Sequence, residues 1–321
     1  MAGKLHLHVL DASSLGDDLD LSVLNPYGNV KIYSTTSPEE VPSHAEGADI
    51  LLVNKVKLNR DNLAKSDRVR LICVFATGFD NIDIPYCQEK GIAVCNVVGY
   101  SSDSVSQVTV AMALSLMSHL REYNEFVRSG AYSRGNIANR LTPVYHEMAG
   151  KVWGIAGLGN IGRRVAAVAK ALGCRVIAYK RTPDSEYPTV TLEELCRQSD
   201  ILSLHLPLSS QTRGLIGETE IGLMKKDIVL VNASRGAITD EAAIAKALSE
   251  GRIGGFGTDV YSAEPFPEDH PLYAVKDNPN VLLTPHMMWG ASEARERCLA
   301  EIVLNINSFL QGETRNRVDL L

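Results

Sequence analysis

The sequence predicts an α/β protein built from two doubly wound parallel-sheet domains. Three observations indicate this fold class: short apolar runs rich in β-branched residues, longer stretches with helical periodicity between them, and a length of 321 residues. Strands that alternate with helices pair in parallel, because a parallel neighbour needs a crossover connection, which a helix supplies. A chain of this length can hold two domains of ordinary size, each with its own core.

The predicted strands fall into two groups along the chain. The first group comprises Leu5–Leu10, Asn29–Tyr33, Asp49–Val53, Val69–Ala76 and Gly91–Val97. The second group comprises Val152–Ala156, Arg175–Tyr179, Ile201–His205, Ile228–Asn232, Gly255–Asp259 and Val281–Thr284. Segments of helical length lie between the strands, for example Arg163–Leu172 and Glu241–Glu250.

Two longer helical patterns follow the two groups of strands. The first, Ser104–Tyr123, is strongly apolar, which fits either a buried connecting helix or a helix at a subunit interface. The second, Ala291–Leu310, carries its apolar residues on one face, so it can pack back on the first domain. We therefore expect a first domain at residues 1–100, completed by 289–321, and a second domain at 101–288.

The composition excludes several classes of protein. Hydrophobic residues make up 45% of the chain and charged residues 22%, which is typical of a soluble globular protein. The net charge of −6 argues against a general nucleic-acid binder, since such proteins need a basic face. We find neither a signal-peptide pattern nor an apolar stretch of the roughly 20 residues that span a bilayer, so we expect a cytoplasmic protein without a membrane partner.

The six cysteines form no CxxC pair and no cluster with the spacing of zinc ligands. Most of them lie inside apolar runs such as Leu71–Phe75 and Ala93–Val97. We interpret them as small buried residues in a reducing compartment, and we expect no metal site.

A glycine-rich turn lies between the first two strands of the second group. It consists of Gly157, Leu158, Gly159, Asn160, Ile161 and Gly162. A GxGxxG sequence is a weak indicator by itself and could be a purely structural turn, but a strand before it and a helix after it are what a dinucleotide site requires. Gly157 would permit the tight turn, Gly159 would let the backbone approach a pyrophosphate, and Gly162 would let helix and strand pack closely.

The end of the second strand after this turn bears on the choice between NAD and NADP. NAD sites usually place an acidic side chain there to accept hydrogen bonds from the ribose hydroxyls. In this chain the place is taken by Lys180, Arg181 and Thr182. Two cations and a hydroxyl suit a 2′-phosphate, which favours NADP(H) over NAD; the alternative is a solvated pair of charges in a loop.

Three later segments place polar side chains at the carboxyl ends of predicted parallel strands, where ligands of such sheets bind. Residues 231–241 contain Arg235, residues 259–265 contain Asp259 and Glu264, and residues 283–289 contain His286 and Trp289. Each residue alone is more often a surface charge or a satisfied histidine. Their joint occurrence behind a dinucleotide turn favours a catalytic site.

With these segments in place, the chain resembles the D-isomer-specific 2-hydroxyacid dehydrogenases over nearly its full length. The resemblance extends to residues 76–83, 99–101 and 205–208, and the 54–56 turn with the spacing of His286 and Trp289 is most similar to the glycerate dehydrogenase and hydroxypyruvate (glyoxylate) reductase branch. Lys180 departs from the family's acidic residue and Val98 from a frequent proline. The resemblance implies a Rossmann NAD(P)-binding domain at 101–288, inserted in a flavodoxin-like substrate domain.

The resemblance also implies a catalytic set of Arg235, Glu264 and His286. Reduction of a 2-keto acid needs a hydride at C2 and a proton at the carbonyl oxygen. His286 would give that proton, because an unperturbed imidazole titrates at about pH 6.5. Glu264 would orient the imidazole and favour its charged form. Arg235 would anchor the substrate carboxylate and carbonyl with its planar fork of donors.

The remaining contacts are implied in the same way. Besides the six residues of the glycine turn, the cofactor would meet Lys180, Arg181, Thr182, His205, Leu206, Pro207, Thr212, Ala233, Arg235, Asp259 and His286. The substrate would meet Asn54, Lys55, Thr77, Gly78, Phe79, Arg235 and Trp289. We assign structural or surface roles to the other histidines, His270 among them.

We therefore expect an NAD(P)-dependent D-2-hydroxyacid dehydrogenase that reduces hydroxypyruvate or glyoxylate. Two alternatives stay open: a reductase of a bulkier 2-keto acid, and a dinucleotide-sensing, corepressor-like binding protein on the same scaffold. The expected partner is a small 2-keto or 2-hydroxy acid. The resemblance also implies a homodimer, with residues 104–123 as the region of the interface.

Overall fold

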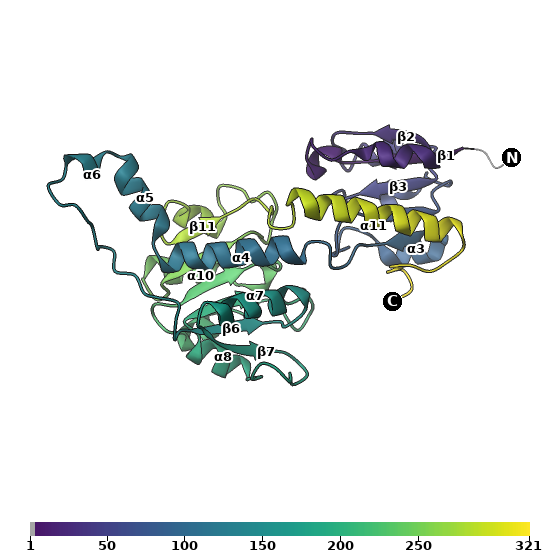
Figure 1. The fold of residues 1–321 in the computed structure, drawn as a ribbon. Coiled ribbons are helices and arrows are strands. Elements are labelled where there is room, and N and C mark those ends of the chain that lie inside the picture. Colours follow the sequence, from purple (N-terminus) through teal and green to yellow (C-terminus); the bar gives the residue numbers. More distant parts are fainter. Residues whose placement is uncertain (1–3) are drawn as a thin grey trace. The chain divides into compact units, whose positions relative to one another are not determined.

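The computed structural model describes residues 4–321 and divides into two compact units (Figure 1). Unit 1 holds the described residues up to Ser101 together with Gly290–Leu321, and unit 2 holds Ser102–Trp289. Each unit contains one sheet whose strands all pair in parallel, so the predicted α/β class is confirmed. Every predicted strand is present at its expected place, with bounds that differ by two residues or fewer at each end.

The sheet of unit 1 has the strand order β2-β1-β3-β4-β5. Its strands are β1 (Leu5–Val9), β2 (Gly28–Ile32), β3 (Ile50–Val53), β4 (Leu71–Val74) and β5 (Ala93–Cys95). Its helices are α1 (Val41–His44), α2 (Arg60–Leu63), α3 (Ile84–Lys90) and α11 (Ser292–Leu310), with 3₁₀ segments at Ala12–Leu15 and Leu21–Tyr27. The strand order reverses between β1 and β3, which is the place where doubly wound sheets bind ligands at their carboxyl edge.

The sheet of unit 2 has the strand order β11-β10-β9-β8-β6-β7. Its strands are β6 (Val152–Ala156), β7 (Arg175–Tyr179), β8 (Ile201–Leu204), β9 (Val229–Asn232), β10 (Gly255–Thr258) and β11 (Val281–Leu283). A single parallel bridge between Ala178 and Thr189 continues the sheet beyond β7. With that bridge counted as the third strand position, the sheet follows the Rossmann order 3-2-1-4-5-6 as far as β10, and the reversal lies between β6 and β8.

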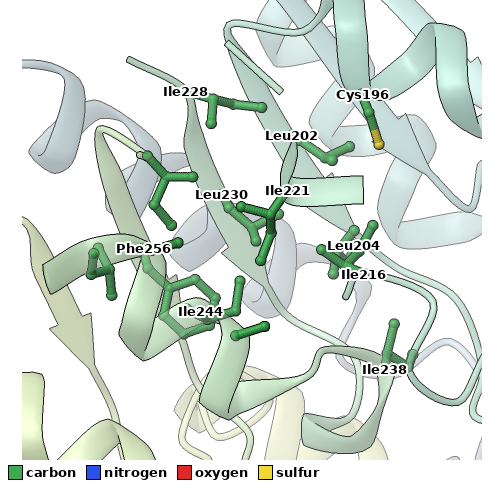
Figure 2. Packing of buried hydrophobic residues seen from close by; sticks show 14 of the residues in the cluster. Cys196, Leu202, Leu204, Ile216, Ile221, Ile228, Leu230, Ile238, Ile244 and Phe256 are labelled. Atoms are coloured by element: carbon green, nitrogen blue, oxygen red, sulfur yellow. The ribbon is translucent and has the colours of Figure 1, made fainter. Parts of the chain in front are cut away.

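Helices cover both faces of the unit 2 sheet. They are α4 (Ser102–Met117), α5 (Leu120–Arg128), α6 (Ala131–Arg134), α7 (Asn160–Ala171), α8 (Leu192–Gln198), α9 (Glu218–Leu223) and α10 (Glu241–Ser249), with 3₁₀ segments at Gly236–Ile238 and Pro271–Val275. Side chains on one strand alternate between the faces: Leu202 and Leu204 join the cluster drawn in Figure 2, whereas Ile201 packs on the opposite face. Both faces are therefore apolar, as in other parallel sheets.

The cluster in Figure 2 joins the strands to α9 and α10. Leu230, Phe256 and Ile244 are fully buried in it. Burial of a side chain of this kind contributes about 1.5–3 kcal/mol each. This packing fixes α10 and the carboxyl ends of β9 and β10, from which the polar residues described below extend.

The helical pattern predicted at 104–123 is divided in two. The chain leaves α4 after Met117 and starts α5 at Leu120, because His119 has a φ of +48°, in the left-handed region that ends a helix. The prediction of one continuous helix was therefore wrong at His119. Most apolar residues of α4 are buried inside unit 2. Gly257 of β10 leaves room for the α4 side chain of Met112, because a Cβ added at Gly257 would lie 3.0 Å from Met112 Sδ.

Among residues 4–321, we find no helix that is both long enough and apolar enough to cross a membrane. The same described range contains no group of three or more His, Cys, Asp or Glu side chains placed to hold a metal ion.

Candidate active site

The glycine-rich turn joins β6 to α7 in unit 2. Gly157 has a φ of +95°, and a Cβ there would lie 2.8 Å from the carbonyl carbon of His205. A Cβ on Gly162 would lie 2.2 Å from the carbonyl oxygen of Gly157, so this glycine lets α7 approach β6. A Cβ on Gly159 would meet nothing within 4 Å. The turn is thus tightly packed at Gly157 and Gly162 and open at Gly159, next to the N-terminus of α7.

The cations that follow β7 gather around one carboxylate. Lys180 Nζ lies 3.2 Å from Asp184 Oδ2, and the guanidinium of Arg163 on α7 pairs with the same oxygen. Asp184 also accepts the N–H of Glu186 at 3.0 Å. Hydrogen bonds from that N–H and from the two cations hold the pKa of Asp184 well below its usual range. Arg181 is exposed next to this cluster.

A chain of hydrogen bonds ends at His205, directly after β8. The indole N–H of Trp153 donates to Ser203 Oγ at 3.0 Å, and that oxygen lies 3.0 Å from His205 Nε2. The Ser203 hydroxyl, which accepts the indole N–H, can also donate its own hydrogen to Nε2, and in that tautomer the ring proton lies on Nδ1. Nδ1 is enclosed and has no hydrogen-bond partner among the described residues. Burial lowers the pKa of His205 to about 3.

Arg235 lies on a turn at the carboxyl end of β9. The side-chain amide of Asn232, itself fully buried, donates to the Arg235 carbonyl at 3.0 Å and accepts the N–H of Ser234 at 3.1 Å. Ser234 Oγ donates to the carbonyl of Leu204 on β8 at 2.6 Å. These bonds fix the backbone of the turn, so the half-buried Arg235 side chain starts from a rigid base.

His286 and Glu264 form a close pair at the carboxyl edge of the same sheet. His286 Nδ1 lies 2.6 Å from Glu264 Oε2, and the two side chains are 24% and 32% exposed. The other oxygen of Glu264 accepts the N–H of Tyr261 at 3.0 Å. His286 has a φ of +53°, a backbone conformation that histidine seldom adopts and that strained functional residues often show.

Asp259 organises the backbone on both sides of His286. Its Oδ1 accepts the Thr284 hydroxyl at 2.6 Å and the Met287 N–H at 2.8 Å, while its Oδ2 accepts the Met288 N–H at 2.8 Å. Burial raises the pKa of Asp259. The carboxylate is 2% exposed, so the contacts that the structure assigns to it lie within the loop that carries His286. Its predicted contact with the cofactor stays a prediction.

The predicted substrate residues of unit 1 lie on two neighbouring loops. Asn54 and Lys55 follow β3, and Thr77–Phe79 follow β4, its hydrogen-bonded neighbour. Asn81 links the loops by donating to the carbonyl of Val56 at 2.9 Å. The Asn54 side chain is buried and donates to Ser14 Oγ at 3.0 Å, which gives it a packing contact inside unit 1.

The other predicted cofactor residues line the carboxyl edge of the unit 2 sheet. Leu158, a residue of the glycine turn, is buried, and Leu206 packs on the cluster of Figure 2. Thr212 donates to the carbonyl of Pro207 at 2.6 Å and so closes the loop after β8. Ala233 is partly buried and packs against the second apolar cluster of unit 2, and so does Trp289, which was predicted to contact the substrate.

A family comparison agrees with this arrangement. The family model described as the D-isomer specific 2-hydroxyacid dehydrogenase, NAD binding domain, matches residues 110–288, more than half of the chain. The chain belongs to the D-isomer-specific 2-hydroxyacid dehydrogenase family. The predicted family is therefore confirmed, and so is the prediction that the protein is an NAD(P)-dependent oxidoreductase of 2-hydroxy acids.

Curated relatives match this dehydrogenase over nearly their full lengths. It is 34% identical to glycerate dehydrogenase of Methylorubrum extorquens, covering 92% of this chain and 93% of the relative. It is 35% identical to hydroxypyruvate reductase of Blautia hydrogenotrophica, covering 97% and 98%. It is 38% identical to glyoxylate reductase of Aeropyrum pernix, covering 91% and 90%. These names agree with the predicted branch of the family.

Solved structures of similar chains contain both kinds of nicotinamide cofactor. D-lactate dehydrogenase of Aquifex aeolicus, complexed with NAD and lactic acid, has a TM-score of 0.86 and 28% identity, covering 96% of each chain. The acyclic imino acid reductase Bsp5, in complex with NADPH and D-Arg, has a TM-score of 0.87 and 27% identity, covering 98% of this chain and 100% of that one.

The residues of unit 2 fit a nicotinamide dinucleotide. The open side of Gly159 lies at the N-terminus of α7, a helix of 12 residues whose first N–H groups and dipole suit a pyrophosphate. His205 Nδ1 adds an enclosed polar atom, without a partner among the described residues, at the neighbouring strand end. This dehydrogenase thus carries on its own chain the groups that such a cofactor requires.

Sequence reasoning gave no role at this site to four residues that shape these loops: Asp11, Asp184, Glu241 and His270, the last of which is buried in agreement with its expected structural role. Asp11 accepts the N–H groups of residues 54–56 at 2.9, 2.6 and 3.3 Å, and burial raises its pKa. Asp184 holds the cations after β7, and Glu241 pairs with His270 at 2.9 Å. Only Asp11 had a visible indicator, since it directly follows a predicted strand at the carboxyl edge of the sheet.

Proposed function

We propose that this dehydrogenase reduces hydroxypyruvate or glyoxylate, with Arg235, Glu264 and His286 as its catalytic residues. The observation that carries the proposal is the 2.6 Å contact between His286 Nδ1 and Glu264 Oε2 at the carboxyl edge of the Rossmann sheet. A carboxylate at Nδ1 fixes the ring, so that Nε2 is the nitrogen that exchanges a proton with substrate. Relatives named hydroxypyruvate reductase and glyoxylate reductase support the choice of substrate.

Each residue has one task in the reduction. Arg235 binds the substrate carboxylate and carbonyl oxygen with its fork of N–H donors, which orients C2. C2 would accept its hydride from a nicotinamide ring held by the residues of unit 2. His286 gives its Nε2 proton to the carbonyl oxygen, and Glu264 stabilises the imidazolium beforehand and orients it throughout. In the direction of oxidation the same imidazole takes the proton back.

The same proposal gives each remaining predicted substrate residue its own task. The N–H groups of Thr77, Gly78 and Phe79 hold the carboxylate, while Asn54, Lys55 and Trp289 border the group attached to C2. The first domain, residues 1–100 with 289–321, then serves as the substrate domain, and residues 101–288 as the cofactor domain. The linked loops after β3 and β4 support this assignment.

We further propose that NADP(H) is preferred over NAD(H). Lys180, Arg163 and exposed Arg181 bring three cations to the end of β7, where Asp184 and Glu186 supply two carboxylates. The remaining positive charge suits a 2′-phosphate, and the buried Asp184 carboxylate already has its acceptor sites filled by cations and backbone N–H groups. Glycine turn residues 157–162, His205, Leu206, Pro207, Thr212, Ala233 and Asp259 line the rest of the groove.

We also propose a homodimer formed through unit 2. Figure 1 shows α5 and α6 extending beyond the end of α4, away from their own sheet. This segment and the loop after it expose large apolar side chains, with Ile137 at 72% and Leu141 at 71%. Exposed apolar groups of this kind mark interaction surfaces, and a second copy would cover them. The interface thus lies mainly after residue 119, because the apolar face of α4 is buried within the unit.

The dimer has a direct test in solution. The paired substitution Ile137→Asp and Leu141→Asp should convert a dimer into a monomer in sedimentation equilibrium, because two desolvated carboxylates would oppose association. The control is Val168→Asp, which charges an exposed apolar residue on α7 outside the segment. A wild-type monomer, or a variant that stays dimeric, contradicts this interface.

The catalytic proposal is tested by crossing substrates with cofactors. Purified protein is given hydroxypyruvate, glyoxylate, pyruvate or phenylpyruvate, each with NADH and with NADPH, and the absorbance of the reduced nicotinamide is followed. The highest kcat/KM is expected for NADPH with hydroxypyruvate or glyoxylate. A maximum with phenylpyruvate would favour the reductase of bulkier 2-keto acids. Cofactor binding without turnover in every pair would favour the dinucleotide-sensing protein.

A further inference from the structure

Unit 2 contains a second histidine–glutamate pair close in sequence to the first. His270 Nε2 lies 2.9 Å from Glu241 Oε2, and the two side chains are 5% and 6% exposed. His270 Nδ1 accepts the N–H of Leu272 at 3.3 Å, so the ring proton resides on Nε2 and points to Glu241. Burying a carboxylate is costly unless its oxygens accept hydrogen bonds. The donors that Glu241 binds therefore show which parts of the chain it holds together.

The other oxygen of Glu241 binds the loop that carries Glu264. Glu241 Oε1 accepts the N–H of Ser262 at 3.0 Å, two residues before Glu264. The neighbouring N–H, that of Tyr261, is the one that Glu264 Oε1 accepts. The Tyr261 hydroxyl donates to the carbonyl of Thr284 at 2.9 Å, which ties the loop to the segment before His286. The buried Glu241 carboxylate therefore holds Ser262, the residue next to Tyr261. Tyr261 in turn binds Glu264 through its N–H and the segment before His286 through its hydroxyl.

The same loop rests on the segment that carries Arg235. A Cβ on Gly236 would lie 2.0 Å from the carbonyl carbon of Tyr261, so the two backbones are in direct contact there. Glu241 begins α10 just after this segment, and Asp240 caps the helix by accepting the N–H groups of Ala242 and Ala243 at 3.0 Å. Glu241 is thus fixed in position at the start of a packed helix.

We infer that Glu241 and His270 are positioning residues for catalysis, which hold the Glu264 loop at the correct distance from Arg235 and His286. Glu241 accepts the Ser262 N–H, and His270 fixes the Glu241 carboxylate by filling its second oxygen. Neither residue touches substrate in this assignment. The inference rests on the proposed function, because it assumes that Glu264 serves His286 in turnover.

Substitutions at Glu241 test the inference by kinetics. Glu241→Ala removes the acceptor of the Ser262 N–H, and kcat should fall by about tenfold to a hundredfold, since small displacements of catalytic groups have effects of this size. Cofactor Kd, measured by quenching of protein fluorescence, should stay at the wild-type value. Glu241→Gln keeps one acceptor oxygen for Ser262 and should recover most of kcat, although it loses the bond to His270.

A matched control separates position from stability. Asp200 is another carboxylate of unit 2 that accepts a backbone N–H, that of Val152 at 2.8 Å, and a second donor, Lys225. It precedes β8, at the edge of the sheet opposite the site. Asp200→Ala should lower the melting temperature and leave kcat unchanged at a temperature where the protein is folded. An equal loss of kcat in Asp200→Ala and Glu241→Ala would overturn the inference.

A double-mutant cycle with Glu264 decides whether Glu241 acts through it. In the Glu264→Ala background, Glu241→Ala should cause little further loss of kcat, because the loop no longer carries the group being positioned. Losses that multiply would overturn the inference, and so would a wild-type kcat in Glu241→Ala. Failure of the proposed function is a distinct result: wild-type protein would then bind cofactor and reduce none of the 2-keto acids.

Discussion

Two histidine–glutamate pairs of nearly the same length lie in unit 2, and they differ mainly in their access to solvent. The His286–Glu264 pair is 2.6 Å long with side chains 24% and 32% exposed, whereas the His270–Glu241 pair is 2.9 Å long and almost wholly buried. In the buried pair, both ring nitrogens and both carboxylate oxygens bind groups of the same unit. Pairing alone therefore does not make a histidine catalytic; a ring that a substrate can reach is also required.

The largest effect expected is the loss of turnover in His286→Ala. Removing a general acid lowers kcat by about 10²–10⁴-fold. The free energy of unfolding should change by less than about 1 kcal/mol, because the side chain is partly exposed and lies outside both apolar clusters. Steady-state kinetics and thermal melting measure the two quantities, and cofactor binding should stay intact. Full activity in this variant would remove His286 from the mechanism.

The opposite pattern is expected for His270→Ala. This substitution leaves the buried Glu241 carboxylate without one of its donors, and the loss of a hydrogen-bond partner by a buried group costs about 1–3 kcal/mol of stability. Urea unfolding measures that loss. The fall in kcat should be smaller than in His286→Ala, because the bond from Ser262 to Glu241 remains. If both histidine variants lost activity and stability equally, the contrast between the pairs would be wrong.

A third histidine, His205, extends the comparison, because its Nδ1 is buried and its ring has no carboxylate partner within residues 4–321. Its pKa is lowered to about 3 by burial, so between pH 6.5 and pH 3 the unfolded chain binds a proton that the folded protein excludes. Stability from this source is present above pH 6.5 and is lost as the pH falls. Relative to His205→Gln, the wild type should lose about 2 kcal/mol between pH 7 and pH 5. A constant difference between the two proteins would contradict the enclosed, neutral ring.

The smallest effect concerns a residue outside all of these pairs. Arg181→Ala should lower kcat/KM for NADPH by about tenfold, since one charge-assisted hydrogen bond is worth about 1.5 kcal/mol or more. The value for NADH should change little, because the ribose hydroxyl carries no charge. The same assay on Arg197→Ala, an exposed cation on α8, provides the control. Equal losses with both cofactors would contradict a contact to the 2′-phosphate.

The sequence was sufficient to predict the framework of the site. Strand ends and the glycine turn could be located because alternation and glycine spacing are local patterns, and Gly157, Gly159 and Gly162 have the geometry expected of them. The 2.6 Å pair of Glu264 and His286 agrees with the role expected from the family. The glycine turn, Glu264 and His286 all follow strands of one parallel sheet. The order of the strands therefore determines which of these residues lie at the same edge.

What the sequence could not reveal depends on contacts between distant residues. Glu241 and His270 are 29 positions apart, and no local pattern indicates that β10 and its loop bring them together. The break at His119 was missed because the apolar periodicity continues across it, while the backbone turns into the left-handed region. No local pattern distinguishes Asp184 from other loop acids, although it is the carboxylate with which Lys180 and Arg163 both pair.

The positive φ of His286 has a consequence for selection. A residue with a Cβ in the left-handed conformation costs about 1 kcal/mol that glycine would not. Selection of a variant library for heat tolerance alone should therefore enrich glycine at position 286, whereas selection for growth that depends on turnover should retain histidine. The residue recovered at this single position would report which of the two pressures had acted on the population.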